Sequence, residues 1–182
     1  ILAQDAPTPF GSRRAPPSSR CVHPRPMVAE GALLPEVEVD GKPGVDGKPI
    51  DVRKLFEGQK GILFGVPGAF TPTCSEKHFP SYMEHHADLK AAGAGVVACV
   101  SVNDPFVMSA WGRELGAEGK VHMLADTRCE LTKALGMELD ATQKLGNTRC
   151  KRFAMLIDGG IIKKIRMDGE AYAPTMLEDL KT

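Results

Sequence analysis

Short apolar runs bounded by glycine and turn residues recur along the chain, and each predicts a buried strand. They lie at Ile62–Val66, Val96–Val102, Val121–Ala125, Phe153–Ile157 and Ile161–Ile165. The last two flank Asp158-Gly159-Gly160, which is a hairpin signal because glycine tolerates the positive φ angles of tight turns. The first run is apolar throughout, which is typical of a strand in a parallel sheet that is covered on both faces.

Helical spacing appears between these runs. Apolar residues and one histidine recur at intervals of three and four at Phe79, Tyr82, Met83, His86 and Leu89, which predicts a helix. A second helix is expected to begin with Asp104 as N-cap and Pro105 at its first position. Its expected apolar face consists of Phe106, Val107, Ala110 and Trp111. Further helices are predicted at Glu130–Leu135 and Pro174–Leu180. Strands that alternate with helices and end in a hairpin and a helix indicate an α/β sandwich.

The region before the first buried run predicts only short elements. Residues 36–40 alternate as a half-exposed strand, residues 50–52 form a returning strand, and residues 53–57 form a helical turn. The sequence Asp-Gly-Lys-Pro occurs twice, at 40–43 and 46–49, and predicts turns at a sheet edge. Ordered structure is expected to begin near Leu34, within a domain that spans residues 31–182.

Residues 1–30 differ in composition from the rest of the chain. They hold six of the fourteen prolines and four arginines, and Asp5 is their only acidic residue before Glu30. Such a segment cannot bury a core, so we expect it to be disordered. Two interpretations remain open: an Arg-rich, acid-poor organellar transit segment, or sequence that precedes a true start at Met27.

Composition adds few constraints. The 182 residues suit one domain, and the formal net charge of zero gives no attraction to nucleic acid or to anionic membranes. The five cysteines, Cys21, Cys74, Cys99, Cys129 and Cys150, are odd in number and form no C-x-x-C pair. This pattern argues against a secreted disulfide framework and against structural zinc, and favours a reducing, intracellular compartment.

Cys74 occupies a chemically distinctive position. It follows the strand at Ile62–Val66, and Thr71 is expected to cap the helix that begins at Pro72. Exposed N–H groups and the helix dipole favour an anion in a first turn, so a thiolate nucleophile is predicted there. The alternative is a small buried side chain, the usual environment of a single cysteine.

The stretch Pro67-Gly-Ala-Phe-Thr-Pro-Thr-Cys74 resembles the P-x-x-x-T-x-x-C signature of peroxiredoxins, in particular their type-5 or plant type-II branch. The similarity covers roughly residues 30–180 and continues through Val96–Gly112, Val121–Asp126, Leu135–Asp140 and Lys151–Gly159. The resemblance implies a thioredoxin-like α/β/α sandwich with a central mixed sheet, and a homodimer. It also implies an antioxidant peroxidase that acts on hydrogen peroxide and small alkyl hydroperoxides and needs no metal, haem or flavin. The compartment is left open among cytoplasm, mitochondrion, chloroplast and peroxisome.

The same resemblance assigns roles to individual residues. Cys74 is the peroxidatic nucleophile, the hydroxyl of Thr71 points at the reacting atoms, and Pro67 shields the thiolate without offering an N–H. Arg152, in Lys-Arg-Phe before a strand, supplies the cation that favours the thiolate and holds the peroxide. Arg149 is the nearest rival for that role.

The second half of the cycle is less determined. A sulfenic acid on Cys74 must be reduced by another thiol. Residues 171–177 contain no cysteine, unlike the resolving segment of animal type-5 relatives, whereas Cys99 matches the proposed resolving position of plant type-II relatives. Cys99 is therefore either the resolving thiol or a core residue. In the latter case glutaredoxin with glutathione, or thioredoxin, reduces Cys74 directly. Cys129 and Cys150 receive no role.

Three other functions are weighed against peroxide reduction. His78 lies one helical turn after Cys74, so a Cys/His thiol hydrolase is conceivable, although no orienting residue is evident. Cys74, His78 and His85 are too few and too scattered for a convincing metal site. A redox sensor that passes its oxidation to a partner protein, and a non-catalytic thioredoxin-like binding module, are the remaining alternatives.

Overall fold

A computed structural model describes residues 27–41 and 48–182. The predicted disorder of the N-terminal segment therefore falls almost entirely outside the described residues, as do parts of both Asp-Gly-Lys-Pro sequences. Residues just after Met27 already contact the domain, because Val28 N–H donates to Leu135 O at 3.1 Å and Glu30 Oε1 accepts from Ile165 N–H at 3.0 Å. The ordered structure thus begins earlier than the expected Leu34.

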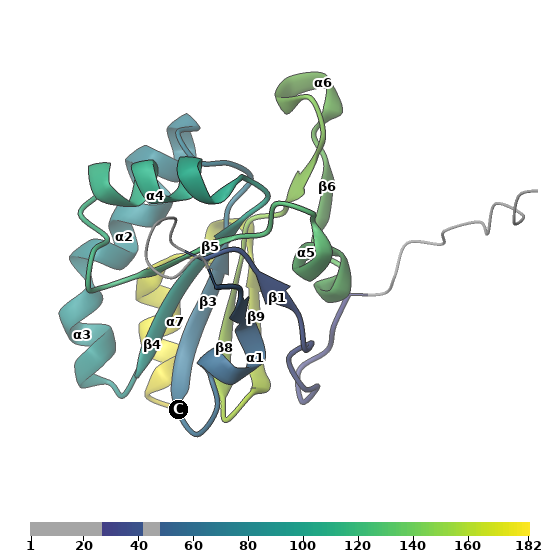
Figure 1. Cartoon of the computed structure of the whole chain (residues 1–182). Helices are drawn as coiled ribbons and strands as arrows, with labels where there is room; N and C mark the ends of the chain where they lie inside the picture. Colours follow the sequence, from purple (N-terminus) through teal and green to yellow (C-terminus); the bar gives the residue numbers. More distant parts are fainter. Residues whose placement is uncertain (1–26, 42–47) are drawn as a thin grey trace, which may run out of the picture.

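The centre of the molecule is a five-stranded mixed sheet in the order β5-β4-β3-β8-β9 (Figure 1). Its strands are β3 (Lys60–Gly65), β4 (Val96–Ser101), β5 (His122–Ala125), β8 (Phe153–Asp158) and β9 (Ile161–Met167). β3, β4 and β5 run parallel, whereas β8 is antiparallel to both β3 and β9. The predicted hairpin is confirmed, with Gly159 and Gly160 at φ 56° and 79° in its turn.

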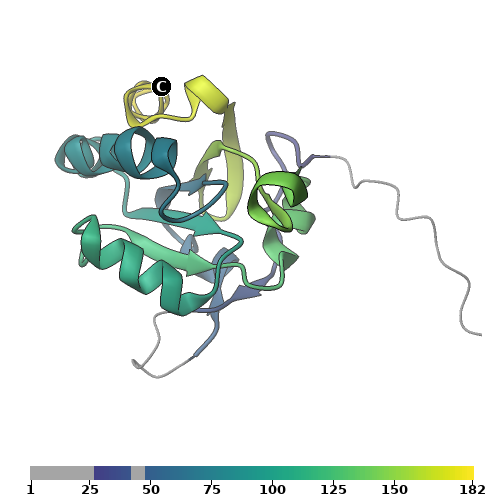
Figure 2. The ribbon, with the colours of Figure 1, turned by 90° about the horizontal axis from the view of Figure 1, so that it is seen from above.

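Two layers cover this sheet (Figure 2). One contains α2 (Phe79–Glu84), α3 (His86–Ala91), α4 (Pro105–Glu114) and α7 (Ala173–Leu180). The other contains α1 (Val52–Leu55), α5 (Glu130–Leu135) and the short strand pair β1 (Glu38–Val39) and β2 (Ile50–Asp51). The predicted α/β sandwich with a central mixed sheet is confirmed.

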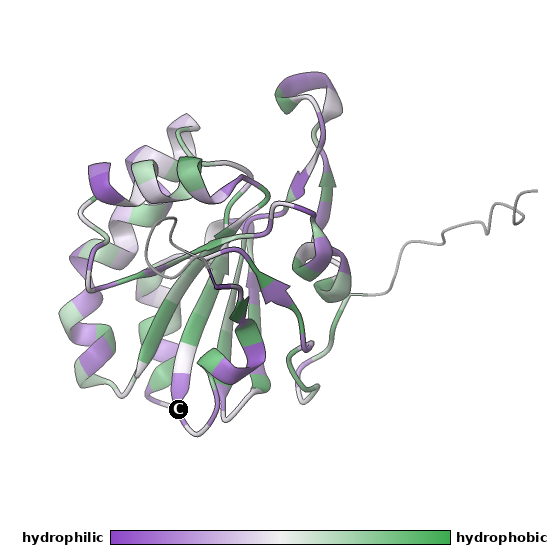
Figure 3. Cartoon of the chain, viewed as in Figure 1, coloured by the Kyte–Doolittle hydropathy of each residue, from purple (hydrophilic) through white to green (hydrophobic). Residues whose placement is uncertain are grey.

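Alternation along the strands divides the core into two clusters. Ile62 and Phe64 face α2, α4 and α7, while Leu63 faces the opposite layer. On β4, Val97 and Cys99 point to the first cluster and Val96, Ala98 and Val100 to the second. The inner strands are accordingly apolar over almost their whole length (Figure 3), because both of their faces are buried.

The helix after Cys74 is less regular than its spacing predicts. A wide π-helical turn, η1 (Cys74–His78), precedes α2, and Phe79 N–H reaches back five residues to Cys74 O. Pro80 lacks the N–H that a regular ladder would use. The single predicted helix is further divided at His85, so α2 and α3 are separate.

Two expectations for the later chain need correction. Asp104 does cap α4, but Phe106 is 71% exposed, and the buried face consists of Met108, Trp111 and Gly112. The pattern also gave no sign of an excursion formed by β6 (Glu138–Asp140), α6 (Thr142–Leu145) and β7 (Thr148–Cys150). This excursion projects beyond the sheet (Figure 1) and leads into β8.

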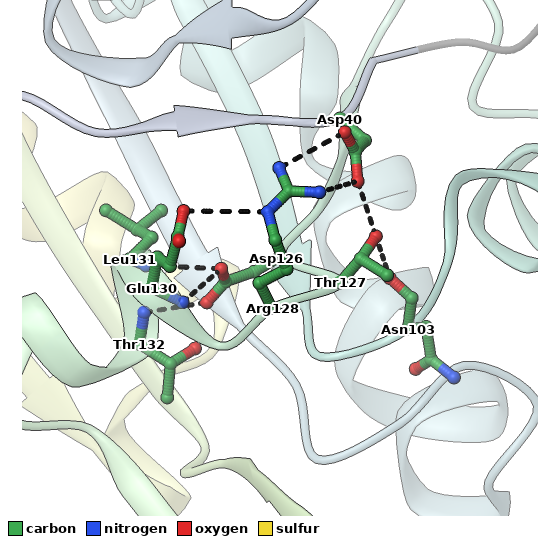
Figure 4. A network of polar contacts seen from close by, with 8 residues as sticks. All are labelled: Asp40, Asn103, Asp126, Thr127, Arg128, Glu130, Leu131 and Thr132. Atoms are coloured by element: carbon green, nitrogen blue, oxygen red, sulfur yellow. Dashed lines mark hydrogen bonds and ion pairs between the residues drawn. The ribbon is translucent and has the colours of Figure 1, made fainter. Parts of the chain in front are cut away.

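A polar network fastens the N-terminal strands to the sheet (Figure 4). Asp40 pairs with Ala125 through its backbone and accepts hydrogen bonds from Thr127 Oγ1 and the Arg128 guanidinium. Buried Asp126 accepts three backbone N–H groups at the start of α5, at 2.7–3.1 Å. These contacts fix α5 against the end of β5.

Candidate active site

Cys74 lies beyond the carboxyl end of β3, after the loop 66–73, and its side chain is almost completely buried, with 1% exposure. Ser75, the next residue, is held by one backbone and one side-chain hydrogen bond. Its N–H donates to Thr71 O at 3.0 Å, and its hydroxyl accepts a hydrogen bond from Trp111 Nε1–H at 3.0 Å. The tryptophan of α4 therefore supports the turn that carries the thiol.

Arg152 is the residue that the fold brings to Cys74 from far along the chain. Its Nη2 lies 3.5 Å from Cys74 Sγ, across a separation of 78 residues. Asp168 N–H donates to Arg152 O, which anchors this segment at the start of β8. A guanidinium at this distance favours a thiolate and can also bind an anionic oxygen.

Arg149, the rival cation, is used differently. Its Nη1 donates to Val102 O at 2.8 Å and its Nη2 donates to Leu145 O at 3.3 Å. The first bond joins the β6–α6–β7 excursion to the end of β4, and the second lies within the excursion. The geometry therefore distinguishes the two arginines, which the sequence alone did not.

Thr71 does not cap the helix with its hydroxyl, which corrects the expectation from its position. Thr71 Oγ1 donates to Gly68 O at 2.9 Å and so closes the loop on itself. Phe70, beside it, has a φ of 61°, a strained value for a residue with a Cβ atom. Pro67 lies half-buried at the start of this loop.

Asn103 is a supporting residue that the sequence analysis missed. Its Oδ1 accepts from Ala69 N–H at 3.1 Å and from Ser101 Oγ at 2.8 Å, which joins the Cys74 loop to the end of β4. A signal for it was available, since a polar residue follows each of two neighbouring parallel strands at the same edge of the sheet.

His78 is not arranged as a base for Cys74. It is fully buried, and its Nε2 donates to Ala171 O at 2.7 Å, the same carbonyl that accepts from Tyr82 OH at 2.6 Å. Burial lowers the pKa of His78 to about 4; the hydrogen bond to Ala171 opposes this shift and the charge of Arg152 adds to it. The ring is therefore neutral at pH 7 and packs against Phe64 and Tyr82.

Cys99 lies opposite Phe64 in the β3–β4 pairing and is completely buried. Burial raises its pKa well above the usual value, and the neighbouring Cys74 and Cys150 sulfurs add to the rise. All four cysteines of the described chain are free.

Among the described residues, no group of three or more His, Cys, Asp or Glu side chains is arranged to bind a metal ion. The described helices also include none with the length and apolar character needed to span a membrane.

Residues 29–180 match the redoxin family. Peroxiredoxin-2E-2, chloroplastic, of Oryza sativa subsp. japonica is 42% identical over 84% of this chain and 71% of its own length. Peroxiredoxin-2E, chloroplastic, of Arabidopsis thaliana is 45% identical over 74% of this chain and 59% of its own length. Peroxiredoxin-2C of Oryza sativa subsp. japonica is 46% identical over 72% of this chain and 82% of its own length.

Solved structures agree with this match. Reduced Prx3 from Vibrio vulnificus in complex with H2O2 superposes with a TM-score of 0.80 and 41% identity, over 85% of this chain and 97% of that one. Peroxiredoxin 5 from Alvinella pompejana gives a TM-score of 0.78 and 39% identity, over 85% and 98% of the two chains. The chain therefore belongs to the redoxin family, whose thioredoxin-like fold it has. Within that family it is a peroxiredoxin, a thiol-dependent peroxidase.

Proposed function

We propose that Cys74 is the peroxidatic nucleophile of this enzyme. The observation that carries the proposal is the Arg152 guanidinium 3.5 Å from Cys74 Sγ, at the carboxyl end of the central strand β3. The thiolate attacks one peroxide oxygen, an S–O bond forms and the O–O bond breaks. The second oxygen leaves with the electron pair and takes a proton, so the products are a sulfenic acid and an alcohol or water.

Arg152 and Thr71 serve the two oxygens of the peroxide. Arg152 Nη1 is buried without a hydrogen-bond partner among the described residues, so it has a donor to offer where negative charge develops. Thr71 Oγ1 donates its own proton to Gly68 O and therefore presents a lone pair that accepts the peroxide O–H. Pro67 borders the site at the start of the loop, and it has no backbone N–H that would compete for the thiolate.

The preferred substrates are hydrogen peroxide and small alkyl hydroperoxides. Cys74 is only 1% exposed, so a compact molecule reaches it more readily than a bulky one. The Vibrio vulnificus relative, solved in complex with H2O2, supports this choice. Antioxidant defence and redox homeostasis follow as the cellular role.

The cycle uses one cysteine of this chain, and an external thiol system, either glutaredoxin with glutathione or thioredoxin, reduces the sulfenic acid. Cys99 is poorly suited to resolve it, because complete burial raises the pKa of that thiol and suppresses the thiolate that must attack. Cys99→Ser therefore retains turnover with the effective reductant. Loss of turnover in that variant, with its fold intact, would make Cys99 the resolving thiol.

The enzyme acts as a homodimer of domains that span residues 31–182, within an organelle. The dimer rests on the family resemblance alone, and the compartment on the Arg-rich N-terminal segment and the chloroplastic names of two relatives. Sedimentation velocity tests the first, and the location of a fluorescent fusion to residues 1–30 tests the second.

Trp111 offers a direct test of the proposed nucleophile. It is the only tryptophan, and its indole contacts the residue next to Cys74. Stopped-flow mixing with peroxide is expected to change its fluorescence rapidly in the wild type and to leave Cys74→Ser unchanged. An undiminished transient in Cys74→Ser would reject the assignment. Sustained turnover with a reductant distinguishes this enzyme from a redox sensor, which stops after one oxidation.

A further inference from the structure

The guanidinium of Arg152 has few polar contacts that could hold it in place. Within the described ranges, Cys74 Sγ is its only hydrogen-bond partner, and its Nη1 is buried without one. A group that stabilises developing charge is effective only when the surrounding structure holds it close to its productive position. The support for Arg152 must therefore come largely through its backbone.

The backbone of Arg152 is held by a short turn that follows β9. Arg152 O accepts a hydrogen bond from Asp168 N–H at 3.0 Å, and Asp168 begins the 3-10 turn η2 (Asp168–Glu170). Asp168 has a φ of 47°, a value that costs energy for a residue with a Cβ atom and is kept where surrounding contacts enforce it. Ala171 N–H donates to Asp168 O at 3.2 Å and closes the turn.

The end of this turn is fixed to the helical segment that carries Cys74. Ala171 O accepts two hydrogen bonds, from His78 Nε2–H at 2.7 Å and from Tyr82 OH at 2.6 Å. His78 lies in η1 together with Cys74, and Tyr82 lies four residues later in α2. Burial raises the pKa of Tyr82 well above its usual value, so its hydroxyl stays protonated and donates at neutral pH. Both donors and the carbonyl that they share are completely buried.

We propose that His78 and Tyr82 are positioning residues for peroxide reduction, which hold Arg152 beside Cys74 through residues 168–171. The inference rests on the roles proposed above for Cys74 and Arg152. These two residues lie 78 positions apart in the chain, and the hydrogen bonds of this turn join the segments that carry them. His78 and Tyr82 themselves do not touch the peroxide. Loss of either bond shifts the turn and with it Arg152, so the rate falls although the thiol and the guanidinium are both present.

A separate contact keeps the neighbouring helix α7 attached when the bonds to Ala171 O are weakened. Ser81 Oγ of α2 donates to His78 O at 2.7 Å and accepts from Ala173 N–H, the first residue of α7, at 3.3 Å. The expected consequence of losing one bond to Ala171 O is therefore a small displacement of the turn in a chain that remains folded.

Tyr82→Phe removes one of the two bonds with almost no change in side-chain volume. Its second-order rate with H2O2, measured by competition with a second peroxidase, should fall roughly 2- to 12-fold, the kinetic equivalent of one neutral hydrogen bond. Tyr172→Phe is the matched control, because it removes the hydroxyl of a tyrosine whose ring contacts His78, and it should react at the rate of the wild type. Circular dichroism establishes that both variants are folded. A wild-type rate in Tyr82→Phe, or an equal loss in Tyr172→Phe, would overturn the proposal.

A double-mutant cycle with Arg152→Met distinguishes positioning from a general weakening of the fold. If Tyr82 acts through Arg152, adding Tyr82→Phe to Arg152→Met should leave the rate of that variant unchanged. Equal slowing in both backgrounds would show that Tyr82 does not act through the guanidinium and would reject the proposal. The single variants identify which step fails. An Arg152→Met chain as fast as the wild type would reject the role of Arg152, whereas a slow Arg152→Met with a fast Tyr82→Phe would reject only the positioning.

His78 provides a second, independent comparison. His78→Gln keeps a side-chain N–H that can donate to Ala171 O, whereas His78→Leu keeps only apolar volume. The rate of the glutamine variant should therefore lie closer to that of the wild type. Equal losses in the two variants would contradict the role assigned to the bond from His78 Nε2.

Discussion

Replacing Arg152 with methionine removes the guanidinium that lies 3.5 Å from Cys74 Sγ while keeping most of the volume of the side chain. A hydrogen bond to a charged group contributes about 1.5–3 kcal/mol. If this contribution is realised in the transition state, the second-order rate with H2O2 should fall roughly 10- to 160-fold, at about 1.36 kcal/mol per factor of ten.

Lys151→Met is the matched control, since it removes a positive charge one residue away without touching Cys74. Rates are measured by competition with a second peroxidase and by Trp111 fluorescence, after circular dichroism has shown that each variant is folded. The explanation fails if Arg152→Met reacts at the rate of the wild type, or if Lys151→Met loses as much activity as Arg152→Met.

Three further predictions concern stability. The pKa of His78 is about 4 in the folded chain, against 6.5 for a free imidazole, so the unfolded chain takes up this proton first as the pH falls. The free energy of unfolding should therefore fall by about 3 kcal/mol as the pH drops from 6.5 to 4. His78→Gln should flatten that profile in urea titrations, and an unaltered slope would exclude His78 as its source. Gly65→Ala places a Cβ in steric overlap with the Phe153 ring, so it should lower the free energy of unfolding by about 1–3 kcal/mol; wild-type stability would show that the strand has room for the methyl group. Asp179→Asn removes the charge that pairs twice with Arg166 and should cost about 1–2 kcal/mol with unchanged peroxidase rates; a slower peroxide reaction would show that this pair also supports the active site.

The sequence predicted the inner strands, and the position of Cys74 shortly after one of them, because both depend on local patterns. The burial of Ile62 and Phe64 follows from their own apolar run and does not require knowledge of the strands beside them. The position of a cysteine after such a run can likewise be read from that segment alone. The β6–α6–β7 excursion was missed because each of its strands is only three residues long. Cys150 is the one buried residue among those six, so the strands carry no apolar signature. Phe106 was misplaced because periodicity fixes the spacing of an apolar face but not which of two adjacent faces meets the core.

The contacts within the site depended on tertiary structure. In the sequence, Arg149 and Arg152 are equally plausible as the cation beside Cys74. The path of β7 into β8 distinguishes them, because it places Arg149 against Val102 O and Arg152 against Cys74 Sγ. The hydrogen bond of the Thr71 hydroxyl also depends on tertiary structure. Its position before Pro72 favours a helix cap, yet the loop geometry directs it to Gly68 O instead. A local propensity is overridden where a loop must close beside a functional residue.

The most direct measurement is the order in which the thiols of the intact, reduced chain react with H2O2. One equivalent of peroxide is added in the presence of dimedone, and tryptic peptides are quantified by mass spectrometry. We expect the label on the peptide Gly61–Lys77, which contains Cys74, while Cys99, Cys129 and Cys150 stay reduced. Labelling of any of those three before Cys74 would show that Cys74 is not the thiol that reacts first with peroxide.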